Sequence, residues 1–498
     1  MRIKGAARMA VLAVAAAATG LVGGCSSIDN GPINIPLSGD AVPNVAAEPF
    51  SPASGSEDTL VGLTFSGGGT RAAAFSFGVL QAFANTDIET GGKRTSLIDR
   101  IDFVSGVSGG SVTAAYFGLK GRAALNDFRE RFLYRNAEED LNTTALAPTT
   151  LIKVYSGGAN DRSNLPRWLD RNLFNGATFG DMLARRRPTV WINASDIANH
   201  APFVFEPNTF RTFCSDLNKL PLSEGVAASA AVPIIFAPIT IQAYPERCSY
   251  EMPRWARFAD EQASAPALLK AHARALAAYR DPAKMRFVRL LDGGITDNFG
   301  LSGLTIARAA ADTPFAPLDA RQAVRLKRAL FLVVNSGRTS EAEWAKTAEG
   351  PTVGPLLMAV VDTGIDSSVR QGFDAFQLTI QSWQNDIIAW RCRLSSAEVT
   401  RLRGSTNGWN CRDVKFLSGE VAFDQLPDKK EKLLSIPTRF VLAKDQVDLL
   451  IEAGQEAVRV NPVVNGFLRA YKVPGSGVAQ DPVHKGRNVA VETIQPSH

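Results

Sequence analysis

The chain has 498 residues, of which 45% are hydrophobic and 21% are charged. This balance indicates a folded protein and excludes both a disordered chain and a polytopic membrane protein. The formal net charge is +5, and Arg2, Lys4 and Arg8 supply three of these charges in a leader that we expect to be removed. The remaining charge of about +2 is too small to favour a nucleic-acid partner.

The beginning of the chain carries the features of an export signal. A basic start and an apolar run over residues 9–22 are followed by two glycines and Cys25. Because this run is shorter than the roughly 20 apolar residues of a spanning helix, we predict a cleaved signal over residues 1–24. Residues 21–25 resemble the lipobox of bacterial lipoproteins, which implies lipidation of Cys25 and anchoring in the outer membrane of a Gram-negative cell. A signal in which Cys25 is incidental is the alternative.

The other four cysteines are Cys214, Cys248, Cys392 and Cys411. An even number in an exported protein predicts two disulfides, and the sequence separations favour pairing Cys214 with Cys248 and Cys392 with Cys411. Free buried thiols are the alternative. None of the four has the close spacing of a zinc site, and no other metal-ligand pattern is visible, so we expect neither a metal nor a cofactor.

Composition divides the rest of the chain. Residues 25–58 are rich in Pro, Ser, Asn, Gly and Ala without periodicity, which predicts a flexible tether. We expect the folded core over residues 59–337 and an extension of helices and strands packed on it over residues 338–475. Residues 476–498 form a polar tail.

Two apolar segments near the start of the core are each followed by a glycine-rich turn and then by a helical pattern. The expected strands are residues 59–66 and 101–105, and the helices begin near residues 70 and 111. Further strands are expected at residues 189–193, 287–291 and 329–334. Strands that alternate with helices predict an α/β fold with a parallel sheet, whose site lies at the carboxyl ends of the strands.

The second glycine turn contains the frame Gly106-x-Ser108-x-Gly110. A serine nucleophile on a sharp strand-to-helix turn needs glycines at these two positions, because a side chain there would collide with the neighbouring strand and helix. The amino terminus of the following helix would favour negative charge developing at Ser108. A serine that only caps the helix is the alternative.

The first glycine turn, Gly67-Gly68-Gly69, can direct several backbone N–H groups to one point, as an oxyanion hole or an anion-binding loop does. The strongest competing function is therefore an anion-binding lipoprotein that holds phosphate without turnover. The turn lacks both the Gly-Lys-Ser/Thr of a nucleotide P-loop and the spaced glycines of a dinucleotide fold. A tight contact between strand and helix is the structural alternative.

Ser108 needs a general base, and the chain has only four histidines, at positions 200, 272, 484 and 498. His498 is terminal, and His200 and His272 lie in no recognisable motif. A Ser-Asp-His hydrolase in the usual chain order would have to use His484, which requires the tail to fold back over the sheet. A His-dependent esterase that uses His484 is therefore retained as an alternative.

Asp292 is the stronger candidate for the base. It follows an apolar strand directly and precedes Gly293 and Gly294. A carboxylate can accept the serine proton if burial raises its pKa, and the flanking glycines allow close approach to another loop. An aspartate that only forms a turn is the alternative.

Together these segments resemble the patatin-like phospholipases. Residues 66–71 are similar to the oxyanion motif of that family, residues 106–110 to its nucleophile elbow and residues 292–294 to its aspartate motif. Residues 193–205 and 228–238 are similar to two blocks that the family carries between the serine and the aspartate. The resemblance implies a three-layer α/β/α fold with a central, mostly parallel sheet.

The resemblance also implies a lipid acyl hydrolase with a Ser-Asp dyad and no histidine. Asp292 would deprotonate Ser108, Ser108 would attack the ester carbonyl, and the amides of Gly67, Gly68 and Gly69 would hold the oxyanion. The substrate would be a membrane phospholipid or another acyl-ester lipid, reached through the lipid anchor.

Three further features have more than one interpretation. Asn298 and residues 240–286 have two each, whereas Arg71 has three: it orders the glycine loop, faces a phosphate or is a solvated arginine. Asn298 either braces the aspartate loop or caps a turn. Residues 240–286 form either a lid over the acyl chain or a packed insertion. The sequence gives no prediction of the oligomeric state.

Overall fold

The computed structural model describes residues 31–38, 58–90, 93–139, 163–233, 235–337, 343–346, 348–469 and 471. The predicted leader, Cys25, most of the predicted tether and the polar tail lie outside these residues. No helix within the described part of the chain is long and apolar enough to cross a membrane.

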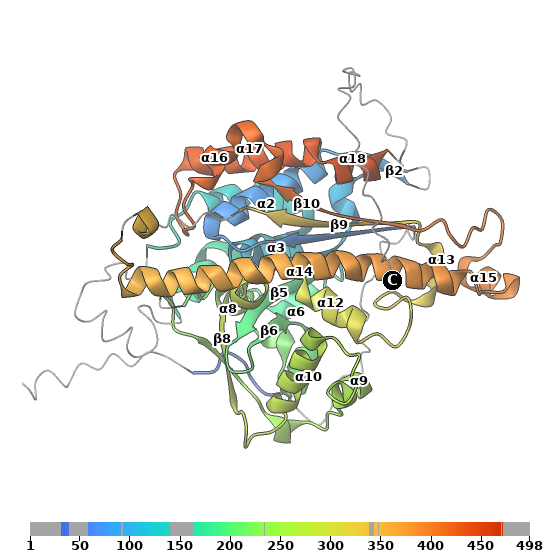
Figure 1. Ribbon diagram of the computed structural model, residues 1–498, viewed down its shortest axis with the longest axis horizontal. Coiled ribbons are helices and arrows are strands. Elements are labelled where there is room, and N and C mark those ends of the chain that lie inside the picture. The colour runs from blue at the N-terminus through green and yellow to red at the C-terminus, as the bar shows by residue number, and fades with distance from the viewer. Residues whose placement is uncertain are drawn as a thin grey trace, which may run out of the picture.

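An eight-stranded sheet forms the centre of the molecule (Figure 1), with the strand order β10-β9-β1-β4-β5-β8-β7 and with β6 paired to β5. Its strands are β1 (Thr59–Phe65), β4 (Ile101–Val107), β5 (Thr189–Asp196), β6 (Ala201–Phe205), β7 (Ile239–Gln242), β8 (Phe287–Asp292), β9 (Arg328–Asn335) and β10 (Lys415–Ala422). β2 (Asp87–Thr90) and β3 (Lys93–Ser96) form a separate hairpin.

The strands from β10 to β5 are all paired in parallel. The pairings of β5 with β6, of β5 with β8 and of β8 with β7 are antiparallel. The predicted α/β fold with a mostly parallel sheet is therefore confirmed, with one correction: the strand that ends at Asp292 runs against its neighbours.

Both faces of the sheet are buried. Successive side chains of a strand point to opposite faces, and those of β9 divide between two hydrophobic clusters. Leu330, Leu332 and Val334 belong to the cluster on one face, and Ala329, Phe331 and Val333 to the cluster on the other. A strand of this kind is stable only with helices on both sides.

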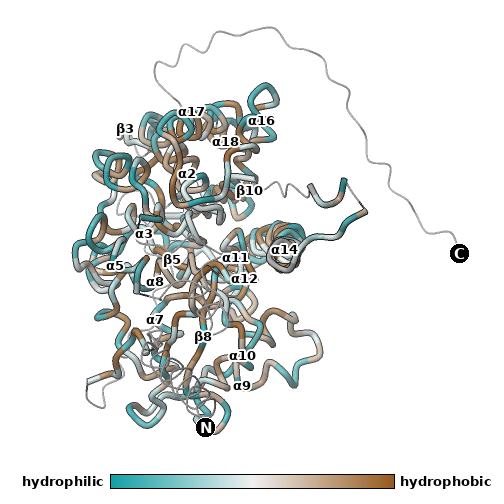
Figure 2. The backbone as a smooth tube through the Cα atoms, turned by 90° about the vertical axis from the view of Figure 1, so that its left-hand side faces the viewer, coloured by the Kyte–Doolittle hydropathy of each residue, from teal (hydrophilic) through white to brown (hydrophobic). Residues whose placement is uncertain are grey.

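Helices supply these two covers. α2 (Gly69–Ala84), α3 (Gly109–Lys120) and α17 (Lys444–Val460) contribute to the first cluster, while α12 (Ser302–Ala309) and the long α14 (Val353–Arg391) contribute to the second. Figure 2 looks along α14 and shows α11 and α12 between it and the sheet. The remaining α-helices are α5 (Asn164–Leu169), α6 (Phe179–Leu183), α7 (Pro207–Thr212), α8 (Leu222–Ser229), α9 (Arg254–Phe258), α10 (Ala267–Tyr279), α11 (Gly294–Asp297), α13 (Ala320–Arg325), α15 (Ser396–Arg403), α16 (Pro427–Leu434) and α18 (Pro462–Leu468).

The segment after residue 337 is part of the same body. β10 lies beside β9 in parallel register, from Lys415 opposite Arg328 to Ala422 opposite Asn335. α17 packs along α2 in Figure 1. The C-terminal extension therefore supplies an edge strand and a covering helix to the sheet.

Segment 240–286 also joins this body. It contains most of β7 at the other edge of the sheet, and its α10 packs against α9 and β6. The structure joins Cys214 to Cys248 and Cys392 to Cys411, the pairings that the sequence separations favour.

Candidate active site

Ser108 occupies a sharp turn between β4, which ends at Val107, and α3, which begins at Gly109. Its φ of 51° and ψ of −122° lie in a region that L-residues rarely adopt, and such strain costs about 1–3 kcal/mol. A Cβ at Gly106 would lie 2.7 Å from the Cβ of Ala114, and one at Gly110 would lie 2.5 Å from the carbonyl oxygen of Phe65. The two glycines are therefore required by close packing around the turn.

Hydrogen bonds hold the backbone of Ser108 on both sides. Its N–H donates to Ser229 Oγ at 2.8 Å, and its carbonyl accepts the hydroxyl of Ser111 at 2.6 Å. Ser229 in turn donates to the carbonyl of Asn193 on β5 at 2.6 Å. Only 5% of Ser108 is exposed, so the strained turn is held inside the protein.

The first glycine loop lies directly against this elbow. A Cβ at Gly67 would lie 3.3 Å from the Cβ of Ser108, and one at Gly109 would lie 1.9 Å from the carbonyl oxygen of Gly69. Gly69 itself has a φ of +59°, which favours glycine. The structure thus brings together the two glycine turns that the sequence placed about 40 residues apart.

The three amides of this loop are not equivalent. The N–H of Gly67 donates to the backbone carbonyl of Asn298 at 3.1 Å, so it is already engaged. The N–H groups of Gly68 and Gly69 donate no hydrogen bond within the described part of the chain. Of the three amides that the sequence suggested for an oxyanion hole, the Gly67 amide is therefore occupied, and those of Gly68 and Gly69 remain the candidates.

Two helices begin at this point. α2 starts at Gly69 and α3 at Gly109, and neither has an acidic residue in its first turn. A helix carries roughly half a positive charge at its amino terminus, and here no carboxylate within either first turn reduces it. The site thus favours negative charge that develops next to Ser108.

Asp292 lies near the same end of the strands as Ser108, but on a strand that runs in the opposite direction. It ends β8 and lies opposite Ala194 of β5, while Val107 lies opposite Asn193 on the other side of that strand. A Cβ at Gly293 would lie 2.3 Å from the carbonyl oxygen of Asn193 and 3.1 Å from Val107 Cγ1. Glycine at position 293 therefore lets the aspartate loop approach the strand that carries Ser108.

The aspartate loop is itself held by several hydrogen bonds. Asp292 Oδ1 accepts the N–H of Gly294 at 2.8 Å, and the Asp292 carbonyl accepts the hydroxyl of Ser195 at 2.8 Å. The N–H of Asp292 donates to the Ala231 carbonyl at 2.9 Å. Asp292 is 7% exposed, so both candidate catalytic residues are buried at one edge of the sheet.

Asn298 links the glycine loop to the aspartate loop. Besides accepting the Gly67 N–H, it places its Oδ1 where a Cβ at Gly67 would be 2.4 Å away and a Cβ at Gly294 2.7 Å away. Asn298 also follows α11 directly as its C-cap residue. Asn298 therefore lies between the glycine loop and the aspartate loop, which fits the expected bracing role.

Arg71 stabilises the glycine loop from behind. The side chain is buried, and its Nη1 and Nη2 donate to the carbonyls of Ile436 at 2.9 Å and Gly337 at 2.5 Å. The solvated alternative is wrong, and the guanidinium donates to two protein carbonyls.

No histidine within the described residues is bonded to Ser108 or Asp292. His272 stacks on Trp255 with ring centroids 5.9 Å apart, and His200 is exposed in the turn between β5 and β6. His484 lies outside the described residues. Among the described residues, no group of three or more His, Cys, Asp or Glu could hold a metal ion.

The sequence analysis missed the polar residues that position the two loops. Asn193 and Ser195 lie on one side of β5, two residues apart, and contact the elbow and the aspartate loop respectively. Ser229 contacts both. In the sequence these three residues are polar positions inside two otherwise apolar segments. Their hydrogen-bond partners lie too far away in the sequence to be recognised from spacing.

Part of the chain matches a known protein family. Residues 63–305 match the model of the patatin-like phospholipase family. No curated protein matches the sequence. Among solved structures, human GIVD cytosolic phospholipase A2 is similar at 12% identity with a TM-score of 0.37, over 83% of this chain and 62% of that chain. Residues 63–305 therefore form a patatin-like phospholipase domain.

Proposed function

We propose that the protein is a serine acyl hydrolase of lipid esters that uses a dyad of Ser108 and Asp292. The observation that carries the proposal is the buried Ser108 in a strained turn, at the amino terminus of α3 and at the same sheet edge as Asp292. The family supports lipid acyl hydrolysis in general terms. The dyad and the choice of substrate are the finer part of the proposal.

In the proposed mechanism, Asp292 accepts the hydroxyl proton of Ser108 while Ser108 Oγ attacks the ester carbonyl. The N–H groups of Gly68 and Gly69 stabilise the resulting oxyanion, aided by the amino termini of α2 and α3. As the tetrahedral intermediate collapses, the carbon–oxygen bond to the alcohol breaks and Asp292 returns its proton to that alcohol.

Water then completes the cycle. Asp292 deprotonates a water molecule, which attacks the acyl-enzyme, and the ester bond to Ser108 breaks. The proton returns to Ser108 Oγ, and a fatty acid leaves. We also propose a location for the enzyme. Lipidation at Cys25 would hold the enzyme at the outer membrane and raise its effective concentration near lipid esters.

The test uses the full chain in detergent micelles, with wild type compared with Ser108→Ala, Asp292→Asn and His484→Ala. Hydrolysis of a phospholipid and of a soluble ester is measured together with labelling by a fluorophosphonate, which reacts with activated serines. We expect Ser108→Ala and Asp292→Asn to reduce hydrolysis at least about a hundredfold, and His484→Ala to leave it unchanged.

Each alternative function predicts a different result. Activity that survives Ser108→Ala would exclude the dyad, and activity that disappears with His484→Ala would support the His-dependent esterase. Binding of inorganic phosphate without hydrolysis or labelling would support the anion-binding lipoprotein.

A further inference from the structure

We propose that Ser229 is a positioning residue that sets the geometry between Ser108 and Asp292. It is the last residue of α8 and is fully buried at 0% exposure. The inference rests on the proposed serine hydrolase activity, because it assigns a role within that same site. In this role Ser229 contributes no proton and touches no reacting atom.

The side chain of Ser229 holds the nucleophile turn. A hydroxyl can accept hydrogen bonds and donate one at the same time. The N–H of Ser108 can only donate, at 2.8 Å, and the carbonyl of Asn193 can only accept, at 2.6 Å. Both directions are therefore fixed: the Ser108 amide donates to Ser229, and the Ser229 hydroxyl donates to β5.

The main chain of the same segment holds the aspartate loop. The carbonyl of Ser229 accepts the N–H of Gly293 at 3.1 Å, and the carbonyl of Ala231 accepts the N–H of Asp292 at 2.9 Å. One short stretch at the end of α8 thus contacts both catalytic loops. The position of Ser108 relative to Asp292 depends on it.

Asn193, the residue of β5 to which the Ser229 hydroxyl donates, is itself held in place. Asn193 Nδ2 donates to Ser105 Oγ at 2.7 Å and to the Gly106 carbonyl at 2.9 Å, and its side chain is buried. The hydroxyl of Ser229 therefore connects the strained turn to a strand that is already bonded to the base of the turn. Movement of the turn would require these bonds to break together.

An alanine at position 229 would remove both bonds of the hydroxyl. The N–H of Ser108 and the carbonyl of Asn193 would lose this partner at a buried place, which is unfavourable. The turn at Ser108 would then relax from its strained φ, and the nucleophile would move relative to Asp292. Small displacements of a catalytic group have large effects on rate, up to about a hundredfold for roughly 1 Å.

The test compares Ser229→Ala with Ser223→Ala in the full chain. Ser223 is a matched control because it lies in the same helix, is buried, and its hydroxyl makes no hydrogen bond among the described residues. Three quantities are measured: kcat and KM for a soluble ester, the rate of fluorophosphonate labelling per folded molecule, and the thermal unfolding midpoint.

We expect Ser229→Ala to lower kcat and the labelling rate about tenfold or more, with KM within about twofold of wild type. Ser223→Ala should stay within about twofold in both rates. If Ser229→Ala does not fold, Ser229→Cys fills the same place with a weaker hydrogen-bonding group, and its labelling rate per folded molecule should also fall. Labelling at the wild-type rate by a folded variant at position 229 would overturn the inference.

The same experiment separates this inference from the proposed function. A wild-type protein that is neither labelled nor active would contradict the proposed function itself. An active wild type with an equally active Ser229→Ala would contradict only the positioning role.

Discussion

Arg71 shows how a residue outside the chemistry fixes the position of the glycine loop. Its guanidinium is buried in the first turns of α2 and bridges two carbonyls, one after β9 at Gly337 and one before α17 at Ile436. These carbonyls are separated by about 100 residues in sequence. The planar fork of an arginine can bind both at once, whereas a lysine presents a single point charge.

We therefore predict that Arg71→Lys lowers the free energy of unfolding by about 1–3 kcal/mol, because at least one buried carbonyl loses its donor. Arg94→Lys is the control, since Arg94 is exposed and paired with Asp87, and should change the free energy by at most about 0.5 kcal/mol. Urea unfolding measures both. Equal losses at the two positions would show that the buried fork has no special role.

At this scale the sequence identified the residues whose signal is local. Ser108, Gly106 and Gly110 lie within five consecutive positions. The packing that requires Gly106 comes from the turn and the helix after it, whereas Gly110 packs against the carbonyl of Phe65 in β1. The engagement of the Gly67 amide could not be predicted, because its partner, Asn298, comes from a loop more than 200 residues later. Hydrogen bonds of this kind follow from the folded topology rather than from spacing.

Among the elements, α2 and α17 make a close backbone approach that bears on the site. A Cβ at Gly78 of α2 would lie 2.1 Å from the carbonyl oxygen of Ile451, and one at Gly454 of α17 would lie 2.3 Å from the carbonyl oxygen of Phe75. Each glycine therefore makes room for the other helix. Since α2 begins at Gly69, the fit of this helix pair also affects the glycine loop.

We predict that Gly78→Ala destabilises the protein by about 1–3 kcal/mol, because the new methyl group forces the two helices apart. The kcat for a soluble ester should fall as well, since α2 carries the loop. Gly372→Ala in α14 is the matched control: a Cβ there meets no atom within 4 Å. It should stabilise the helix by up to about 1 kcal/mol. Thermal unfolding and ester hydrolysis test both, and a stabilising Gly78→Ala would contradict the close contact.

The elements also show where sequence reasoning ends. The period and composition of β1, β4, β5, β8 and β9 were sufficient to locate all five strands. The reversed direction of β8 was not predicted, because direction depends on the connection through β7 at the far edge of the sheet. The candidate aspartate was identified from its local motif, Asp292-Gly293-Gly294 after an apolar strand, whereas its position opposite Ala194 could not be predicted.

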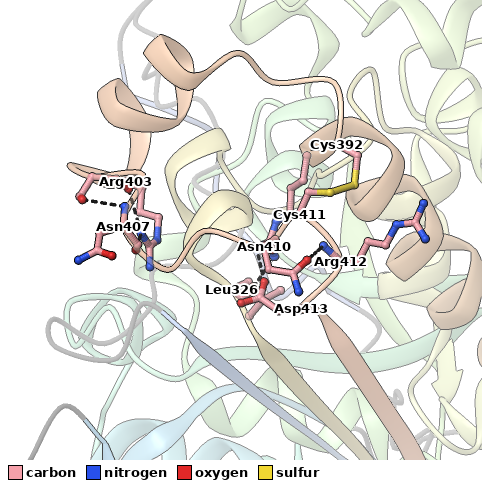
Figure 3. Close-up of polar contacts among 10 residues, drawn as sticks. Leu326, Cys392, Arg403, Asn407, Asn410, Cys411, Arg412 and Asp413 are labelled. Carbon is pink, nitrogen blue, oxygen red and sulfur yellow. Dashed lines mark hydrogen bonds and ion pairs between the residues drawn. A yellow bond between two sulfur atoms is a disulfide. The ribbon is translucent and has the colours of Figure 1, made fainter.

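At the scale of the whole molecule, the two ends of the parallel strands have different roles. The carboxyl ends of the strands carry the site, while the opposite end is closed by the end of α14. There Arg391 donates to the carbonyls of Leu326 at 2.7 Å and Asn410 at 3.0 Å and to Asp413 at 2.6 Å. The Cys392–Cys411 disulfide lies beside this cluster (Figure 3). Together they fix α14 to the segments that enter β9 and β10.

This arrangement predicts that stability and catalysis respond differently to loss of the disulfide. The bond closes a loop with a sequence separation of 19, and loops of that size contribute about 3 kcal/mol through the entropy of the unfolded chain. The double variant Cys392→Ser with Cys411→Ser should lose about that much in urea unfolding. The disulfide lies at the opposite end of the strands from Ser108. We therefore expect kcat per folded molecule to stay within about twofold of wild type. A large loss of kcat in the folded variant would instead show that α14, which packs on α11 next to Asp292, transmits changes from one end of the strands to the other.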